Sequence, residues 1–125
     1  MMREEAISLP LANGWSSQSV AVWLRADGRC EYCNRDLLGC EDAHFHGSHI
    51  DHIVPKHGDN LENLALSCTA CNYMKRNRAF NVEKPAMTRA ELITAAREHI
   101  QGVRDRNRDR LKQSVQWLTC CGLKR

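Results

Sequence analysis

Two pairs of cysteines with identical spacing constrain this chain more than any other feature. Cys30 and Cys33 form the first pair, and Cys68 and Cys71 form the second. Each pair is typical of a tight turn that presents two thiolates to one tetrahedral metal ion. Four thiolates fill the shell of a zinc ion and leave no position for water. We therefore expect one structural Zn²⁺ that joins two distant parts of the chain.

Other roles for the cysteines are less favoured by the pattern. The chain holds seven cysteines, and an odd number argues against a closed set of disulfides. A redox-active pair usually accompanies a βαβ pattern, which this sequence does not show. Redox-active or inert thiols remain the alternatives to zinc, and Cys40, Cys120 and Cys121 lie outside the two pairs.

The composition is that of an ordinary folded protein. Hydrophobic residues make up 42% of the 125 residues and charged residues 26%, and a chain of this length favours one domain with appendages. No apolar run approaches the ~18 residues that a membrane span needs, and residues 1–10 carry no apolar signal segment. We therefore predict a cytoplasmic protein without a membrane partner.

Basic residues gather in two places, although the net charge of +3 is too small to identify a nucleic-acid-binding protein. The first group is Lys75, Arg76 and Arg78. The second group is Arg97, Arg104, Arg106, Arg108, Arg110 and Lys112. For the second group a solvated helix face is an open alternative.

Helices are expected on both sides of the cysteine pairs. Ser16 and Ser17 can cap a helix that ends at Gly28. Thr88 and Glu91 have the spacing of a capping box, which predicts the start of a long C-terminal helix. Its apolar stripe predicts packing on the core, with a dimer interface or a DNA-docking arm as alternatives. The stripe consists of Ile93, Ala96, Ile100, Val103, Leu111, Val115 and Leu118.

The central part of the chain predicts strand, loop, strand and helix. Residues 34–47 lack a clear period and are expected to form a loop. Residues 48–54 suit a short strand closed by Pro55, and residues 64–67 suit the returning strand. The second cysteine pair then begins a helix that includes Arg76 and ends before Pro85.

Three motifs stand in order across this region. They are Cys30-Glu31-Tyr32-Cys33, then Ile50-Asp51-His52-Ile53-Val54-Pro55, then Asn63-Leu64 followed by Cys68-Thr69-Ala70-Cys71-Asn72. Together, over about Arg29 to Arg78, they resemble the HNH endonuclease family. The resemblance implies an α+β fold with a small zinc-stapled ββα-metal core. We expect an N-terminal helical extension at 1–28, the nuclease core at 29–84 and the C-terminal helix at 85–125.

The resemblance also implies a catalytic set. His52 would be the general base, and Asp51 would be a ligand of the catalytic metal. Asn72 stands where the family name has histidine, and its side-chain oxygen favours Mg²⁺ or Mn²⁺ over softer metals. Asn63 would pin the loop between the strands through its amide. Because neighbours on a strand point to opposite faces, a strand end or a distortion must bring Asp51 and His52 to one site.

Other side chains are candidates for contact with nucleic acid or metal. Lys75 and Arg76 follow Asn72 by about one turn, so we expect them, Lys75 above all, near a phosphate, with helix-surface solvation as the alternative. His57 is a further candidate for approach to the scissile phosphate. An extra metal site from Cys40, His44, His46 and His49 is not favoured, because their spacing matches no zinc pattern.

The expected activity is that of a metal-dependent endonuclease. It would cut double-stranded DNA to 5′-phosphate and 3′-hydroxyl ends, as the resemblance implies. RNA cleavage by the same site and a non-catalytic zinc-ribbon-like adaptor are the alternatives. The sequence contains no second DNA-reading motif, so we expect weak sequence preference or targeting by a protein partner. It predicts no oligomeric state.

Overall fold

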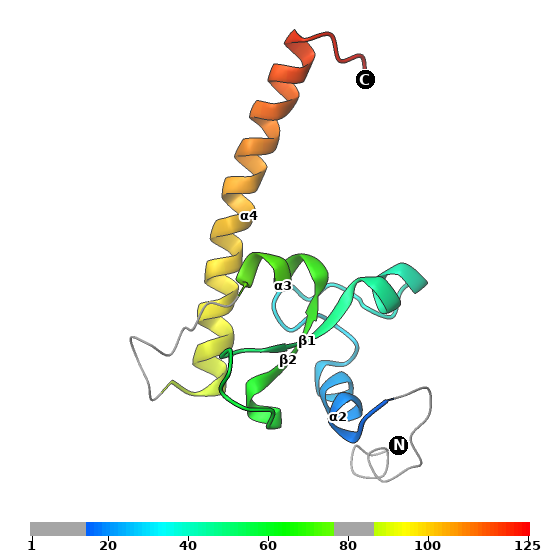
Figure 1. Cartoon of the computed structure of the whole chain (residues 1–125), viewed down its shortest axis with the longest axis vertical. Helices are drawn as coiled ribbons and strands as arrows, with labels where there is room; N and C mark the ends of the chain where they lie inside the picture. The colour runs from blue at the N-terminus through cyan, green and yellow to red at the C-terminus, as the bar shows by residue number, and fades with distance from the viewer. Residues whose placement is uncertain (1–14, 77–86) are drawn as a thin grey trace.

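The computed structural model describes residues 15–76 and 87–125 and shows a small two-stranded sheet with helices packed around it (Figure 1). At its centre, strand, loop, strand and helix follow one another, which confirms the α+β class and the expected ββα core. The elements in chain order are helix α2 (Ser17–Ala26), the π-helical turn η1 (Asp42–His46), strand β1 (Ser48–His52), the 3-10 turn η2 (Leu61–Asn63), strand β2 (Leu64–Cys68), helix α3 (Thr69–Lys75) and helix α4 (Arg89–Cys120).

The two strands form an antiparallel hairpin whose register runs from Ser48 opposite Cys68 to His52 opposite Leu64. The first strand is two residues shorter than predicted, because Asn63 already belongs to the turn η2 and Val54 N–H donates to the Asn63 side chain (2.9 Å) instead of to a strand partner. Strand β2 is buried along its whole length. It therefore runs through the middle of the hydrophobic core.

Helix α2 begins and ends where its local signals predict. The Ser16 hydroxyl accepts from Ser19 N–H, and Asp27 closes the helix in the left-handed conformation. Gly28 follows with φ of 68°, and a Cβ at this position would clash with the Leu38 side chain. Glycine is favoured there because of its backbone conformation, since the exposed Leu38 side chain could move away from a Cβ. The turn delivers the chain directly to Cys30.

The segment between the two halves of the core is more regular than predicted. Residues 34–47 were expected to be a loop, but Asp42–His46 form a π-helical turn and Arg29 makes an isolated antiparallel bridge with Asp36. A five-residue π turn is too short to produce a hydrophobic period that could be recognised in the sequence. The expectation of an irregular loop was therefore wrong for its second half.

Helix α4 begins with the predicted capping box, in which Thr88 and Glu91 satisfy each other's backbone N–H groups. Ile93, Ala96 and Ile100 are buried in one hydrophobic cluster with Val22 of α2 and with β2. The flanking helices and the sheet thus share one core. No helix among the described residues is long and apolar enough to cross a membrane.

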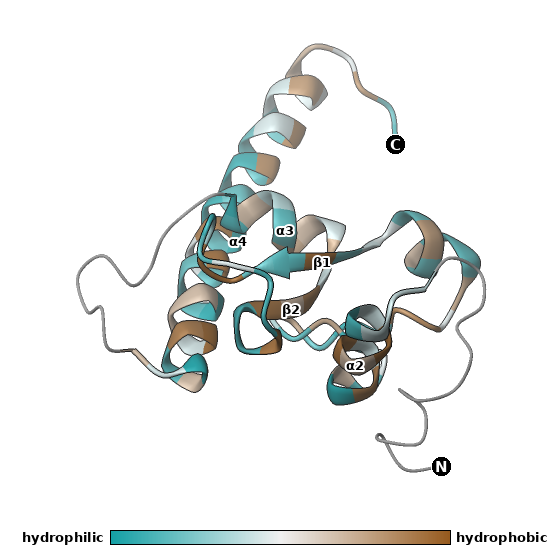
Figure 2. Cartoon of the chain, turned by 60° about the horizontal axis from the view of Figure 1, so that its bottom comes forward, coloured by the Kyte–Doolittle hydropathy of each residue, from teal (hydrophilic) through white to brown (hydrophobic). Residues whose placement is uncertain are grey.

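The second half of α4 leaves the core and projects away from it (Figures 1 and 2). Leu111 is 64% exposed, and Val115 and Leu118 are also exposed. The prediction that the whole apolar stripe packs on the core is therefore wrong beyond Val103. A helix of 32 residues is about 48 Å long and extends past a core this small.

Some predicted features lie outside the described residues. These are the start of the N-terminal extension, Arg78, and the stretch before Pro85. Within the described part, α3 ends at Lys75, and Arg76 follows it with a φ of 55°.

The loop between the strands is closed by the Asn63 side chain, which is 6% exposed. Its amide oxygen accepts from Val54 N–H (2.9 Å), and its amide nitrogen donates to the carbonyls of Val54 (3.0 Å) and Gly58 (2.9 Å). One side chain thus holds both ends of the bend that follows β1. This bend determines where the residues after His52 lie.

We expect Asn63→Ala to lower the free energy of unfolding by about 2–3 kcal/mol or more, because it leaves buried backbone groups of Val54 without partners. Chemical denaturation of the zinc-loaded protein measures the loss. Asn60→Ala is the matched control, since the Asn60 side chain makes no capping hydrogen bond to η2. Equal stability of the two variants would contradict the assigned role.

Candidate functional site

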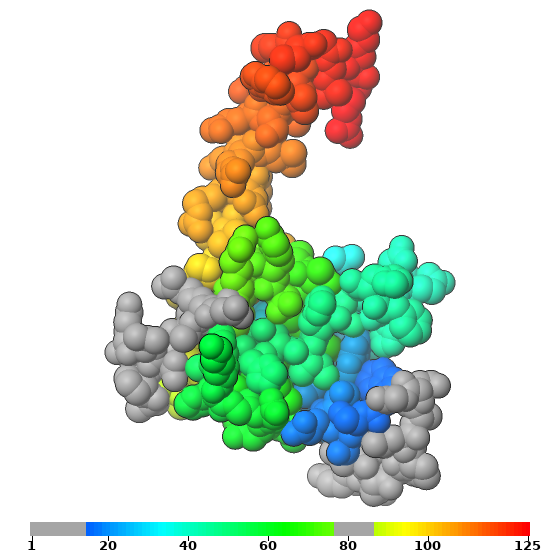
Figure 3. Space-filling model, in the orientation of Figure 1, coloured from blue at the N-terminus to red at the C-terminus, as the bar shows by residue number. Residues whose placement is uncertain are grey.

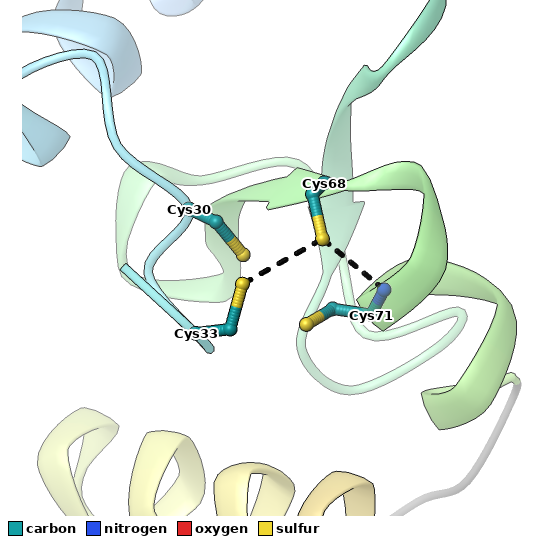
Figure 4. A group of neighbouring side chains, drawn as sticks. All are labelled: Cys30, Cys33, Cys68 and Cys71. Atoms are coloured by element: carbon teal, nitrogen blue, oxygen red, sulfur yellow. Dashed lines mark hydrogen bonds between the residues drawn. The ribbon is translucent and has the colours of Figure 1, made fainter. Parts of the chain in front are cut away.

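Four sulfur atoms meet at one point between the sheet and the helices (Figure 4). Cys30 and Cys33 come from the turn after α2, Cys68 ends β2, and Cys71 lies in the first turn of α3. All four Sγ atoms lie within 4.8 Å of one another, and those of Cys33 and Cys68 are 3.7 Å apart. A tetrahedral zinc ion with Zn–S bonds of about 2.3 Å requires sulfurs about 3.8 Å apart. The donor set and its spacing therefore fit one zinc ion.

The close approach of four thiols also favours a bound cation. Hydrogen bonding from Cys33 lowers the pKa of the Cys30 thiol to about 6. The hydrogen bonds that Cys33 and Cys71 donate to neighbouring sulfurs raise the pKa values of these two thiols. Like charges this close cannot all ionise unaided, whereas a bound metal ion deprotonates its thiol ligands.

Two arginines of α4 reach this cluster. Arg104 Nη2 donates to the Cys71 sulfur at 3.1 Å, and Arg97 donates through Nε (2.9 Å) and Nη2 (2.7 Å) to the carbonyl of Glu31, between Cys30 and Cys33. Burial would lower the pKa of Arg104, but the hydrogen bond and the charge of Cys71 raise it. From the sequence, both arginines could face solvent or contact nucleic acid, but they contact the cysteine turns instead.

Glu31 is a junction that sequence reasoning did not identify. Its Oε1 accepts from Arg25 of α2 (3.0 Å) and from Leu66 N–H of β2 (3.1 Å), and its Oε2 accepts from Arg89 of α4 (2.6 Å). Burial would raise the pKa of Glu31, but the hydrogen bonds from Arg89, Leu66 and Arg25 lower it below 4.5. No local sequence pattern predicts this role, because the three partners of Glu31 lie in separate parts of the chain.

A second group of polar residues lies at the end of β1. Asp51, His52 and Asp59 line a hollow of about 730 Å³ together with Lys56 and Pro55. His52 is the last residue of its strand, so the chain bends there and brings neighbouring residues to one hollow. This is the strand end that the sequence analysis required.

His52 and Asp51 have different surroundings. The His52 ring is 43% exposed, and its Nε2 lies 2.6 Å from Oδ1 of Asp59. Asp51 is 10% exposed, and its Oδ2 accepts from the Tyr32 hydroxyl at 2.7 Å and lies 3.1 Å from Lys75 Nζ. Burial and the charge of Asp51 raise the pKa of Tyr32, so this phenol stays protonated and remains a donor.

Lys75 is not the surface cation that the sequence analysis expected. It is 1% exposed, and its Nζ also donates to the His52 carbonyl at 3.1 Å. A position three residues after Asn72 lies on the same side of α3, and this side faces the hairpin. The amino group thus contacts Asp51 and the His52 carbonyl and does not face solvent. Half-buried Asn72 lies one turn earlier on the same helix.

The other candidates do not line this hollow. Arg76 is exposed, and its guanidinium lies over the Tyr73 ring at 4.7 Å. His57 lines a different hollow, with Asn63 and Arg89. His49 contacts Thr69, and His44 packs between aromatic rings. Among the residues that the structure describes, the four cysteines are the one group of three or more His, Cys, Asp or Glu side chains whose ligand atoms lie close enough to share a metal ion.

Zinc binding by the cluster can be tested with one ligand and one free cysteine. We expect about one zinc per parent chain and a loss of most of it in Cys33→Ser, because a hydroxyl replaces one of four thiolates. Elemental analysis of dialysed protein measures the content. Cys40→Ser is the control, since Cys40 is exposed and outside the cluster. Retention of zinc by Cys33→Ser at the parent level would exclude this ligand set.

The lowered pKa of Glu31 predicts a pH-dependent contribution to stability. The folded state favours the carboxylate, so its contribution is complete above the unfolded pKa and disappears as the pH falls through the lower folded value. We expect Glu31→Gln to destabilise the protein by about 1.5–3 kcal/mol near pH 7, and the difference from the parent to shrink in acid. Urea denaturation at several pH values tests this. A difference that grows as the pH falls would have the wrong sign.

Comparisons with known proteins agree with the architecture. Residues 30–78 match the family model described as HNH endonuclease. Over 117 residues the chain is 29% identical to the CRISPR-associated endonuclease Cas9 of Corynebacterium diphtheriae. That alignment covers 90% of this chain but only 9% of the relative, so the chain spans about a tenth of its length. No solved structure matches the chain significantly.

Proposed function

We propose that the HNH endonuclease domain at residues 30–78 hydrolyses phosphodiester bonds in DNA and leaves 5′-phosphate and 3′-hydroxyl ends. The observation that carries the proposal is the hollow at the end of β1, where His52 and Asp51 lie side by side with Asp59. An imidazole and carboxylates at an open surface are the groups that metal-assisted hydrolysis uses. Zinc held by the four cysteines would maintain this geometry without entering the reaction.

His52 is the general base in this proposal. An ionised carboxylate only accepts hydrogen bonds, so the contact with Asp59 places the ring proton on Nε2 and leaves the lone pair on Nδ1. A neutral ring in this tautomer can take a proton from water. Asp59 would hold the ring and stabilise its charge after proton transfer. It is a positioning residue that the sequence analysis did not select.

Asp51 and Asn72 are the proposed ligands of the catalytic metal. Tyr32 and Lys75 engage one oxygen of Asp51, and the other oxygen remains for a cation. Mg²⁺ and Mn²⁺ prefer carboxylate and amide oxygens of this kind. When bound, such an ion stabilises the negative charge that develops on the leaving oxygen. Lys75 would orient Asp51 rather than contact a phosphate.

We expect His52→Ala to reduce the cleavage rate by about a hundredfold to ten-thousandfold, which is the usual contribution of a general base. Zinc content and DNA affinity should stay near the parent values, because the substitution changes no cysteine and no lysine or arginine. Supercoiled plasmid with Mg²⁺ or Mn²⁺ provides the assay.

His57→Ala is the matched control, because His57 is exposed and lines a separate hollow. A His52→Ala protein that cuts as fast as this control would remove the proposed mechanism. A parent that cuts RNA but not DNA would favour the RNA nuclease. A parent that cuts neither with Mg²⁺ or Mn²⁺ would favour the non-catalytic adaptor.

A further inference from the structure

The positive charge of the chain is concentrated at its C-terminal end. Residues 101–125 contain seven basic and two acidic residues, a net charge of +5, whereas the whole chain carries +3 and residues 1–100 therefore carry −2. Every residue from Asp105 onward is exposed. Figure 3 shows this part of α4 standing clear of the rest of the described molecule. The excess charge therefore faces solvent and is available to a partner.

A basic groove lies where this helix leaves the core. The hollow has a volume of about 500 Å³ and is bounded by α3 and α4. Arg76 lines it from the end of α3, and Arg106 and Arg110 line it from α4. His99 and Asn107 add polar groups, and no carboxylate is among the described residues that line the groove.

The arginines are arranged to act together. The Arg76 guanidinium is held against Tyr73, with Nη2 3.1 Å from the hydroxyl. Arg106 and Arg110 are one turn apart on the same side of α4, about 6 Å along its axis. The same side continues to Trp117, roughly 27 Å along the axis from His99. It forms an extended surface rather than a pocket for a small anion.

One side of the groove lies about one helical turn from Asn72, a proposed ligand of the catalytic metal. Arg76 follows Asn72 by one turn, and its N–H donates to the Asn72 carbonyl at 3.0 Å. A DNA strand with its scissile phosphate at Asp51 and Asn72 would contact Arg76 with a neighbouring phosphate and would then reach α4.

We propose that Arg76, Arg106 and Arg110 bind the phosphate backbone of double-stranded DNA and guide it to the hollow at His52. That the bound DNA is the substrate of the nuclease rests on the proposed function, whereas the binding of DNA by these arginines does not. Guanidinium groups match phosphate geometry through paired N–H donors. Duplex DNA carries one negative charge per ~1.7 Å of axis, so an extended basic helix face suits it.

The test compares two double variants with equal loss of charge. Arg106→Gln/Arg110→Gln alters the groove. Arg108→Gln/Lys112→Gln alters the opposite side of α4, about 200° around the helix. All four side chains are exposed, so helix content should be unchanged, and circular dichroism verifies this. Both pairs are made in the His52→Ala background, and binding to a short labelled DNA duplex is followed by fluorescence anisotropy over a range of salt concentrations.

We expect the groove pair to weaken binding at least about tenfold and to reduce the slope of log K against log salt by about 2, which corresponds to two lost phosphate contacts. The control pair should change the slope by less than about half of that. Equal effects of the two pairs would overturn the proposal, as would a parent that does not bind the duplex. Binding of poly-glutamate with the same affinity and the same dependence on Arg106 and Arg110 would instead assign the groove to acidic proteins.

Cleavage assays separate this proposal from the nuclease function. If the chain with His52 intact cuts no nucleic acid while the groove pair still loses DNA affinity, the groove stands and the nuclease fails. If that chain cuts DNA and the two pairs bind alike, the nuclease stands and the groove fails.

Discussion

The cluster of four sulfurs is the contact on which the remaining structure depends. It joins the turn after α2 to the end of the hairpin and the first turn of α3. More than 30 residues separate the first cysteine pair from the second. A core this small buries too little apolar surface to hold such distant segments firmly. Metal binding contributes to folding because the unfolded chain has no preformed site. Because β2 pairs with β1, the cluster thus aligns β1 with α3, and those two elements carry the proposed general base and both proposed metal ligands.

The arginines of α4 extend this cross-link to the C-terminal helix. Arg89, Arg97 and Arg104 follow one another at intervals of about two turns and contact Glu31, its carbonyl and Cys71. Because these contacts end at Arg104, the first half of α4 belongs to the core and the second half projects. The arginines beyond that point face solvent, where the proposed DNA groove begins. One helix therefore has a structural half and a binding half.

The hairpin end explains how adjacent strand residues serve one site. Asp51 points inward to Tyr32 and Lys75, whereas His52 is exposed and contacts Asp59. The buried ammonium compensates the buried carboxylate, since an unpaired charge at either position would be costly. The Asn63 amide holds the following bend and so determines where Asp59 lies. The proposed base and its orienting carboxylate thus depend on a buried amide that takes no part in the chemistry.

The sequence alone determined the features that depend only on residues close together in the chain. The spacing of Cys30 and Cys33, the cap at Ser16, the capping box at Thr88 and the order of strand and helix are local, so they could be predicted. Only the tertiary structure decided the destinations of long polar side chains. Lys75 is buried on Asp51, and Arg97 and Arg104 reach the cysteine turns, because the hairpin and the four-cysteine cluster bring distant segments together. Asp59 meets His52 because the Asn63 amide closes the loop between them. A lysine or arginine on a helix has no periodic signal for its partner, since its reach spans both solvent and core.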